Sequence, residues 1–112
     1  MATLNYIELP VGSAAESMQF YSSAFGWQFT GYGPDYAAYE DGPCQLGLNG
    51  TSDERTARIL PVIEVGNIEN MRQSVIDAGG HISRDIFAFP GGRRFHFTDP
   101  DGLELACYVK ES

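Results

Sequence analysis

The side chains whose types and spacing could do chemistry together are Glu8, Arg94, His96 and Tyr108. Each lies in a stretch expected to form a strand, at a position whose side chain would point into a groove. A histidine or a carboxylate can act as a general base near neutral pH, and convergent polar groups in an apolar groove are typical of a small-molecule site. By strand alternation, the residues expected to face the groove are Tyr6, Glu8, Leu60, Val62, Arg94, His96, Glu104, Ala106 and Tyr108.

The polar members of this set also have structural interpretations. Glu8 and Arg94 could neutralise one another, because buried charges need partners. His96 could be the base of an enzyme or a hydrogen-bonded interior histidine. Tyr6 and Tyr108 are expected to be aromatic walls rather than acid catalysts. The catalytic candidates are therefore Glu8 and His96, and the sequence leaves open whether either is used.

The elements that must position these residues follow from an internal repeat. Val11 and Val65 each precede a helical stretch, and Gly26 and Gly80 follow the two stretches at the same offset (65 − 11 and 80 − 26 are both 54). A repeat of this length is one supersecondary unit that cannot bury its apolar face alone. We therefore expect a single domain over residues 1–112, with halves of about 1–52 and 57–112 and a concave site between them.

Capping signals and apolar periodicity define the elements of each half. The first helix is expected to begin at the capping-box pair Ser13 and Glu16 and to end at Gly26. Its apolar stripe is Ala14, Met18, Tyr21 and Phe25. The second helix, residues 68–78, is expected to begin after the N-cap Asn67. Its apolar stripe is Ile68, Met71, Val75 and Ala78. The expected strands are residues 4–11, 27–32, 35–40, 44–49, 58–65, 81–86, 92–98 and 103–110.

This order predicts an α+β fold, in which two βαβββ repeats form a curved eight-stranded mixed sheet with two outer helices. The stretch Phe89-Pro90-Gly91-Gly92 precedes one of the groove strands. Its glycine pair would permit a mobile flap over the groove, and the alternative is an ordinary long turn.

The composition excludes several classes of partner. A formal net charge of −8 disfavours nucleic acids and anionic membrane surfaces, because both repel an acidic protein. No apolar run approaches the length of a membrane span, and the first residues lack the pattern of a signal peptide. Cys44 and Cys107 form no disulfide framework, and neither is expected to be a nucleophile. We therefore expect a cytoplasmic protein with free thiols.

Three motifs resemble those of a known family: Phe20-Tyr21 followed by Phe25-Gly26-Trp27, Asp77-Ala78-Gly79-Gly80, and Asp99-Pro100-Asp101-Gly102. Their order is that of the vicinal oxygen chelate superfamily, the glyoxalase, bleomycin-resistance and extradiol-dioxygenase group. The stretch from Phe89 to Phe97 resembles a small glyoxalase-like branch of it. The resemblance covers essentially the whole chain and implies the paired βαβββ fold.

The resemblance also implies where a metal would be held, because enzymes of this superfamily bind a divalent ion with four side chains, two from each half. The corresponding positions are Tyr6, Leu60, Ala106 and, for the fourth, Leu46 or Gly47. Leucine and alanine cannot ligate a metal, and a neutral tyrosine is a poor ligand. Glu8 and Glu104 each lie two residues from a ligand position, but two carboxylates make a sparse site. We therefore expect no metal and no cofactor.

We accordingly expect a glyoxalase-like protein that binds a small organic molecule in a concave groove without a catalytic metal, as the bleomycin-resistance proteins do for their drug. The alternative is a lyase, isomerase or dioxygenase-related enzyme of the group that uses Glu8 or His96 as its base. It would not be a typical metal-dependent lactoylglutathione lyase. Exposed sheet edges also predict a homodimer.

Overall fold

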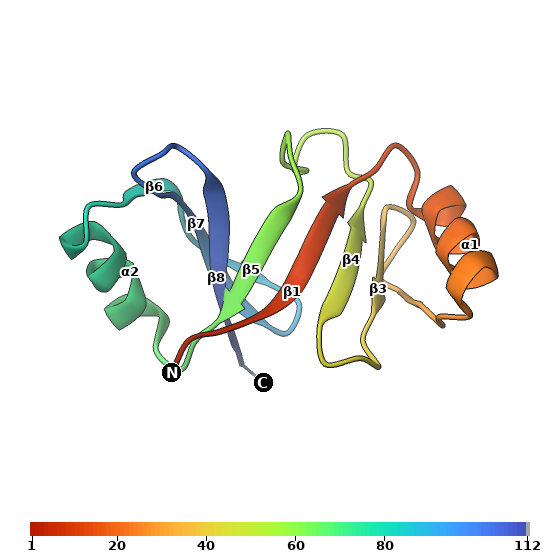
Figure 1. Cartoon of the computed structure of the whole chain (residues 1–112), viewed down its shortest axis with the longest axis horizontal. Helices are drawn as coiled ribbons and strands as arrows, with labels where there is room; N and C mark the ends of the chain where they lie inside the picture. Colours follow the sequence, from red (N-terminus) through yellow and green to blue (C-terminus); the bar gives the residue numbers. More distant parts are fainter. Residues whose placement is uncertain (112) are drawn as a thin grey trace. The chain divides into compact units, whose positions relative to one another are not determined.

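The computed structural model describes residues 1–111 and confirms the α+β class, with the helices and strands in the predicted order (Figure 1). The elements are β1 (Thr3–Pro10), α1 (Ala14–Phe25), β2 (Thr30–Gly31), β3 (Tyr36–Tyr39), β4 (Gln45–Asn49), β5 (Leu60–Glu64), α2 (Ile68–Asp77), β6 (His81–Phe89), β7 (Gly92–Thr98) and β8 (Glu104–Lys110). Neither described helix is long and apolar enough to cross a membrane, which takes about 20 residues.

The chain forms two compact units. The first unit is Tyr6–Leu60, and the second unit comprises Met1–Asn5 together with the chain from Pro61 onward. In the first unit the strand order is β2-β3-β4-β1, with β1 parallel to β4 and the other pairs antiparallel. In the second unit the order is β5-β8-β7-β6, with β5 parallel to β8 and the other pairs antiparallel. Each unit therefore pairs the first strand of its βαβββ repeat with the last, as an internal repeat requires.

The helix ends follow from local capping chemistry. The Glu16 amide donates to the Ser13 hydroxyl at 3.2 Å, which satisfies one of the free donors at the start of α1. The helix ends at Gly26, whose φ of 72° lies in the left-handed region that glycine adopts without strain. At the start of α2, the Asn70 amide donates to the Asn67 side chain at 2.9 Å. The predicted N-caps and the Gly26 C-cap are confirmed.

The apolar core is best developed in the second unit. Phe95 has no exposed surface, and it lies on the face of β7 that α2 covers. Phe95 forms a buried cluster with Val65, Ile68 and Cys107. In the first unit, buried apolar side chains include Ala14 of α1, Ala37 of β3 and Leu48 of β4. These two cores fix which face of each sheet remains for a site.

Two predictions about the helix stripes are wrong. Phe25 is 58% exposed, because it lies in the last turn of α1 and stacks on Trp27 with ring centroids 4.9 Å apart. Trp27 in turn stacks on Tyr39 at 4.7 Å and lies before the short strand β2 rather than within it. Ala78 is an exposed C-cap, since α2 ends at Asp77. Both stripes were extended one position beyond the part of the helix that packs on the sheet.

The segment around Pro90 is neither a flap nor a long turn. β6 continues to Phe89, which pairs with Gly92, so that only Pro90 and Gly91 form the loop. Proline fixes φ at the first turn position, and Gly91 supplies the positive φ, 103°, that the second position requires. A Cβ atom built on Gly92 would lie 2.0 Å from the Val109 carbonyl oxygen, so the second glycine permits close strand pairing.

Candidate functional site

The polar face of the first unit is assembled from β1, β3 and β4. Tyr6 aligns with Gln45, Glu8 with Gly47, and Tyr36 with Asn49. Because side chains alternate along a strand, these residues point away from the face that carries the core residues Ala37 and Leu48. The side chains that meet on this face are Tyr6, Glu8, Tyr36 and Asn49. We call this group the tyrosine–glutamate network.

The tyrosine–glutamate network has a defined direction of hydrogen bonding. Tyr36 donates its hydroxyl proton to Glu8 Oε1 at 3.0 Å. The hydroxyls of Tyr6 and Tyr36 lie 2.5 Å apart, and Tyr6 must be the donor, because Tyr36 has only one proton to give. Asn49 donates to the other carboxylate oxygen of Glu8 at 3.3 Å. Glu8 is 1% exposed, so these donors stabilise a carboxylate that is removed from water.

The same surroundings keep Tyr36 protonated. Burial is the largest cause that raises the pKa of Tyr36 far above its ordinary value of 10.0, and the negative charge of Glu8 raises the pKa further. Contacts with Tyr6 act in the same direction. Tyr36 is therefore a fixed hydrogen-bond donor near neutral pH and not a group that exchanges protons there.

Gly47 is essential to this arrangement, and it shares a face with Glu8, unlike Leu46, the other candidate for the fourth ligand-equivalent position. Leu46 pairs with Ile7 and so belongs to the opposite face, whereas Gly47 pairs with Glu8. A Cβ atom built on Gly47 would lie 2.2 Å from the Tyr36 hydroxyl oxygen and 2.4 Å from that of Tyr6. The two phenols therefore occupy the space into which a side chain at position 47 would extend.

The polar face of the second unit follows the alternation expected from the sequence. Arg94 pairs with Tyr108 and His96 with Ala106, while Phe95 points to the core on the other face. The predicted residues that share this face are Val62, Arg94, His96, Glu104, Ala106 and Tyr108. Glu8 belongs to the first unit and Arg94 to the second. The pairing of these two residues stays a prediction. Leu60, the first residue of β5, has an apolar side chain and is 1% exposed.

Glu104 positions two polar side chains of the second unit. Its Oε2 atom lies 3.2 Å from Nδ1 of His96 and accepts a hydrogen bond from the Ser83 hydroxyl at 3.0 Å. His96 is 2% exposed. A carboxylate at Nδ1 favours the tautomer in which Nδ1 carries the proton and Nε2 carries the lone pair. This geometry suits a hydrogen-bonded interior histidine and also an oriented base.

A second polar cluster in this unit surrounds Tyr108. Its hydroxyl donates to Asn5 Oδ1 at 3.1 Å, and Asn5 Nδ2 donates to Glu64 Oε1 at 2.9 Å. Burial is the main cause that raises the pKa of Tyr108, and the charge of Glu64 adds to it. Tyr108 therefore remains protonated near neutral pH, like Tyr36.

Sequence reasoning missed several members of these clusters. In the first unit they are Tyr36 and Asn49, and in the second they are Asn5, Glu64 and Ser83. Tyr36 and Asn49 lie in predicted strands, at positions that strand alternation would have assigned to the polar face. Ser83 could not be found in this way, because β6 contains register shifts.

The residues at the four ligand-equivalent positions do not fit a divalent metal. Leu60 and Ala106 have no donor atom, Gly47 has no side chain, and the hydroxyl of Tyr6 gives its proton to Tyr36. Among residues 1–111, no group of three or more His, Cys, Asp or Glu side chains is placed to hold a metal ion. The polar face of the first unit thus carries a hydrogen-bond network beside Tyr6 and Gly47, two of the positions that the resemblance assigns to metal ligands.

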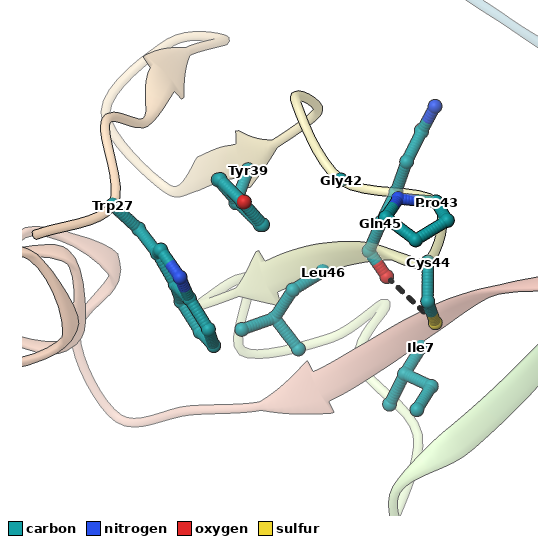
Figure 2. A pocket seen from close by; sticks show the side chains of 8 residues that line it. All are labelled: Ile7, Trp27, Tyr39, Gly42, Pro43, Cys44, Gln45 and Leu46. Carbon is teal, nitrogen blue, oxygen red and sulfur yellow. Dashed lines mark hydrogen bonds between the residues drawn. The ribbon is translucent and has the colours of Figure 1, made fainter. Parts of the chain in front are cut away.

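A cavity of about 360 Å³ lies in the first unit, and it is not at the predicted groove (Figure 2). Its lining residues are Ile7, Trp27, Tyr39, Gly42, Pro43, Cys44, Gln45 and Leu46. Ile7 and Leu46 point to the face opposite Tyr6 and Glu8, so the cavity and the tyrosine–glutamate network use different faces of the sheet. The stacked rings of Trp27 and Tyr39 form part of its wall. No charged side chain lines it.

A sequence model of the Glyoxalase/Bleomycin resistance protein/Dioxygenase superfamily matches residues 3–106. Since this match covers most of the chain, the protein belongs to that superfamily. No curated protein matches the chain at a significant level.

Solved structures share the fold at low sequence identity. The NAD-dependent benzaldehyde dehydrogenase from Legionella pneumophila has a TM-score of 0.80 and 18% identity, over 96% of this chain and 99% of that chain. The methylmalonyl-CoA epimerase from Mycobacterium tuberculosis has a TM-score of 0.78 and 12% identity, over 98% and 89%. The Mn(II)-bound glyoxalase from Novosphingobium aromaticivorans has a TM-score of 0.69 and 20% identity, over 97% of this chain and 40% of that one. These likenesses show the fold alone.

Proposed function

We propose that this protein binds a small organic molecule on the polar face of the first unit and does so without a catalytic metal. The observation that carries the proposal is the position of the Tyr6 and Tyr36 hydroxyls, which fill the space beside Gly47. Both tyrosines are half-buried. Glu8 accepts a hydrogen bond from Tyr36, and Tyr36 accepts one from Tyr6, so the directions of both hydroxyl groups are fixed. Such fixed polar groups confer orientation and specificity on small-molecule sites.

The direction of the hydrogen bonds defines what such a ligand would offer. The proton of Tyr6 is given to Tyr36 and that of Tyr36 to Glu8, so the phenol oxygens present lone pairs rather than protons. A ligand that donates hydrogen bonds fits these acceptors. A positively charged donor fits best, because the chain has a net charge of −8.

Metal and mass analyses of the purified protein test the proposal. We expect native mass spectra to contain a non-covalently bound organic molecule and elemental analysis to find no stoichiometric Ni, Zn, Mn or Fe. A metal present at one equivalent would overturn the metal-free assignment. Turnover of the methylglyoxal–glutathione hemithioacetal that a chelator abolishes would overturn it as well.

Matched variants test the location of the site. Any molecule that raises the melting temperature of the parent protein should bind about 10-fold more weakly to Tyr6→Phe, because one hydroxyl acceptor is lost. Tyr21→Phe is the control, since in the described part of the chain the Tyr21 hydroxyl makes no hydrogen bond and its ring packs on Phe25. Equal affinities for the parent and Tyr6→Phe would place the ligand elsewhere.

A second candidate function is general-base catalysis, which the contact between His96 and Glu104 favours. In this case His96 would remove a proton from a carbon acid and return it, with no net redox change. Exchange of the carbinol proton of the same hemithioacetal with D2O, insensitive to chelator and lost in His96→Gln, would support it. Absence of exchange in the parent protein would exclude that substrate.

The remaining expectations concern the chain as a whole. A single domain over residues 1–112 predicts one cooperative unfolding transition. A homodimer predicts twice the chain mass in light scattering at micromolar concentration, and a monomer there would contradict it. A cytoplasmic location predicts recovery in the cytosolic fraction of lysed cells.

A further inference from the structure

The cavity of the first unit is built on a row of side chains that crosses three neighbouring strands. Leu46 of β4 aligns with Ile7 of β1 on one side and with Tyr39 of β3 on the other. This row shares a face with the core residues Ala37 and Leu48, because side chains two apart on a strand point the same way. Ala37 and Leu48 are buried where α1 contacts β3 and β4, whereas Ile7 is 36% exposed. The row is therefore a part of the core face that remains open to solvent.

Aromatic rings form a wall beside this row. Trp27 stacks on Tyr39, with ring centroids 4.7 Å apart and ring planes inclined by 12°. Phe25, at the end of α1, stacks on the same indole ring at 4.9 Å. Gly42 lies against the Tyr39 ring, since a Cβ atom built on it would be 3.2 Å from Cε2 of that ring. The rings therefore support one another, and rigid apolar walls of this kind are typical of small-molecule sites.

The turn between β3 and β4 closes the other side of the cavity. Pro43 and Cys44 lie away from Trp27, and Leu46 lies between them and the indole ring (Figure 2). The proline ring restricts the backbone of this turn. The thiol of Cys44 is exposed and lies 3.7 Å from the carbonyl oxygen of Gln45. A reagent in solution can therefore reach a thiol that belongs to the cavity wall.

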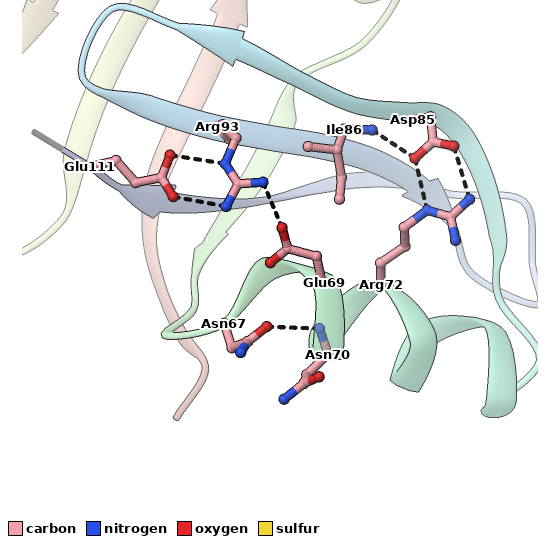
Figure 3. A network of polar contacts seen from close by, with 8 residues as sticks. All are labelled: Asn67, Glu69, Asn70, Arg72, Asp85, Ile86, Arg93 and Glu111. Carbon is pink, nitrogen blue, oxygen red and sulfur yellow. Dashed lines mark hydrogen bonds and ion pairs between the residues drawn. The ribbon is translucent and has the colours of Figure 1, made fainter.

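The residues that line this cavity are all uncharged, in a chain whose net charge is −8. The second unit differs, because ion pairs attach α2 to its sheet. Arg72 of α2 pairs with Asp85 at 2.7 Å, and Arg93 of β7 pairs with Glu69 and Glu111 (Figure 3). An ionised molecule in the cavity of the first unit would lose its hydration without gaining an opposite charge. An uncharged occupant is therefore favoured.

The volume and the walls of the cavity indicate the kind of molecule that fits. An apolar protein cavity of about 150 Å³ accommodates benzene. The cavity here has about 360 Å³, which is room for a molecule of two fused rings. Aromatic rings attract one another in offset-stacked and edge-to-face arrangements, beyond the effect of buried area. Trp27 and Tyr39 therefore favour an aromatic molecule over a saturated one of equal size.

We propose that this cavity binds an uncharged aromatic molecule of about two fused rings. It is a second binding site, on the face of the sheet opposite the tyrosine–glutamate network, and it goes beyond the function proposed for that network. The network offers acceptor oxygens to a hydrogen-bond donor, whereas the cavity offers apolar and aromatic contacts.

Titration of the uniformly ¹⁵N-labelled full chain with quinoline at pH 8 tests this site. Quinoline is neutral at this pH, has two fused aromatic rings and has no proton to donate to the tyrosine–glutamate network. Trp27 is the single tryptophan, so the one indole N–H signal of the protein reports on the cavity wall. We expect saturable shifts of this signal and of the amides of residues 42–46, and slower reaction of Cys44 with a thiol reagent. The absence of saturation would overturn the proposal.

Two related probes test the chemical class of the ligand. Decalone, a saturated ketone of two fused rings, should bind about 3-fold more weakly than quinoline, because it lacks the aromatic contacts. A quinoline carboxylate should bind about 10-fold more weakly or less, because its charge finds no partner in the cavity. Binding of either probe that equals or exceeds that of quinoline would refute the assigned class.

Matched variants test the location of the site. Cys44→Phe adds a ring inside the cavity and should weaken quinoline binding about 10-fold or more, because the space is filled. Ser52→Phe is the control, since it adds the same ring at an exposed position of the first unit outside the cavity, and it should leave the affinity unchanged. Equal affinities for Cys44→Phe and the parent protein would refute the site. Tyr6→Phe should bind quinoline as the parent protein does, so the two proposals fail separately.

The thiol reaction also distinguishes a small molecule from a second copy of the chain. Without quinoline, the rate at which Cys44 reacts should be independent of protein concentration. A rate that falls as the protein concentration rises would show that a second copy covers the cavity, and this result would overturn the proposal.

Discussion

Replacement of Tyr36 by phenylalanine removes one oxygen atom from the centre of the tyrosine–glutamate network. That oxygen donates to Glu8 Oε1 at 3.0 Å and accepts from Tyr6 at 2.5 Å. A hydrogen bond to a charged group contributes about 1.5–3 kcal/mol, and a neutral one about 0.5–1.5 kcal/mol. We therefore expect Tyr36→Phe to lower the free energy of unfolding by about 2–4 kcal/mol at pH 7.

This loss should itself depend on pH. The pKa of Tyr36 is raised in the folded state, chiefly by burial, so the folded protein keeps a proton that the unfolded chain releases above its ordinary pKa of 10.0. The unfolded state then binds fewer protons, and the free energy of unfolding falls as the pH rises above 10. The contribution of Tyr36 is complete below pH 10 and decreases by about 1.4 kcal/mol for each pH unit above it.

Urea unfolding of the parent protein and Tyr36→Phe between pH 7 and 11.5 measures both effects. Subtracting the two free energies cancels the ionisation of the other tyrosines, and Tyr21→Phe serves as the control with an undisturbed network. The advantage of the parent protein should be constant up to pH 10 and should shrink beyond it. A constant difference across the whole range would refute the argument that the hydroxyl of Tyr36 is buried against Glu8.

The other predictions concern the core, the thiols and the close approach of two strands. Phe95→Ala should lower the free energy of unfolding by about 3–5 kcal/mol, whereas Phe25→Ala should cost about 1 kcal/mol, because Phe95 is fully buried and Phe25 is 58% exposed; equal losses in urea unfolding would contradict this. In the native protein at pH 8, Cys44 should react with a thiol reagent, while Cys107, whose pKa burial raises to about 11, should react only after unfolding; two fast equivalents would disprove it. Gly92→Ala should destabilise the protein by about 1–3 kcal/mol, since the new methyl group would meet the Val109 carbonyl, and an unchanged melting temperature would rule that out.

Much of the fold could be predicted from the sequence, because the relevant signals are local. The caps at Ser13 and Asn67 and the left-handed Gly26 depend on residues within one helical turn. Strand alternation correctly separated Arg94 and His96 from Phe95, since β7 pairs with β8 in an unbroken register. Regular local geometry therefore determined the order of the elements and the faces of the regular strands.

The candidate site was only partly predictable, because its members meet through pairings between distant segments. Glu8 was identified, but its partners Tyr36 and Asn49 are 28 and 41 residues away. The close contact of Gly47 with two phenols arises where β1, β3 and β4 align, and no local pattern encodes it.

The sequence by itself determined the repeat, the helix caps, and the absence of donor atoms at Leu60 and Ala106. The tertiary structure decided the burial of particular side chains and the direction of those that follow an irregular strand. Phe25 continues an apolar stripe yet lies exposed, because it is the last residue of α1 and stacks on Trp27 instead of packing on the sheet. Arg84 lies two residues after the core residue Ile82, so a regular strand would place both on the same face. Arg84 instead lies on the other face, because β6 contains register shifts. Helix position and strand register are set by packing between segments far apart in the chain, which residue types and local spacing do not specify.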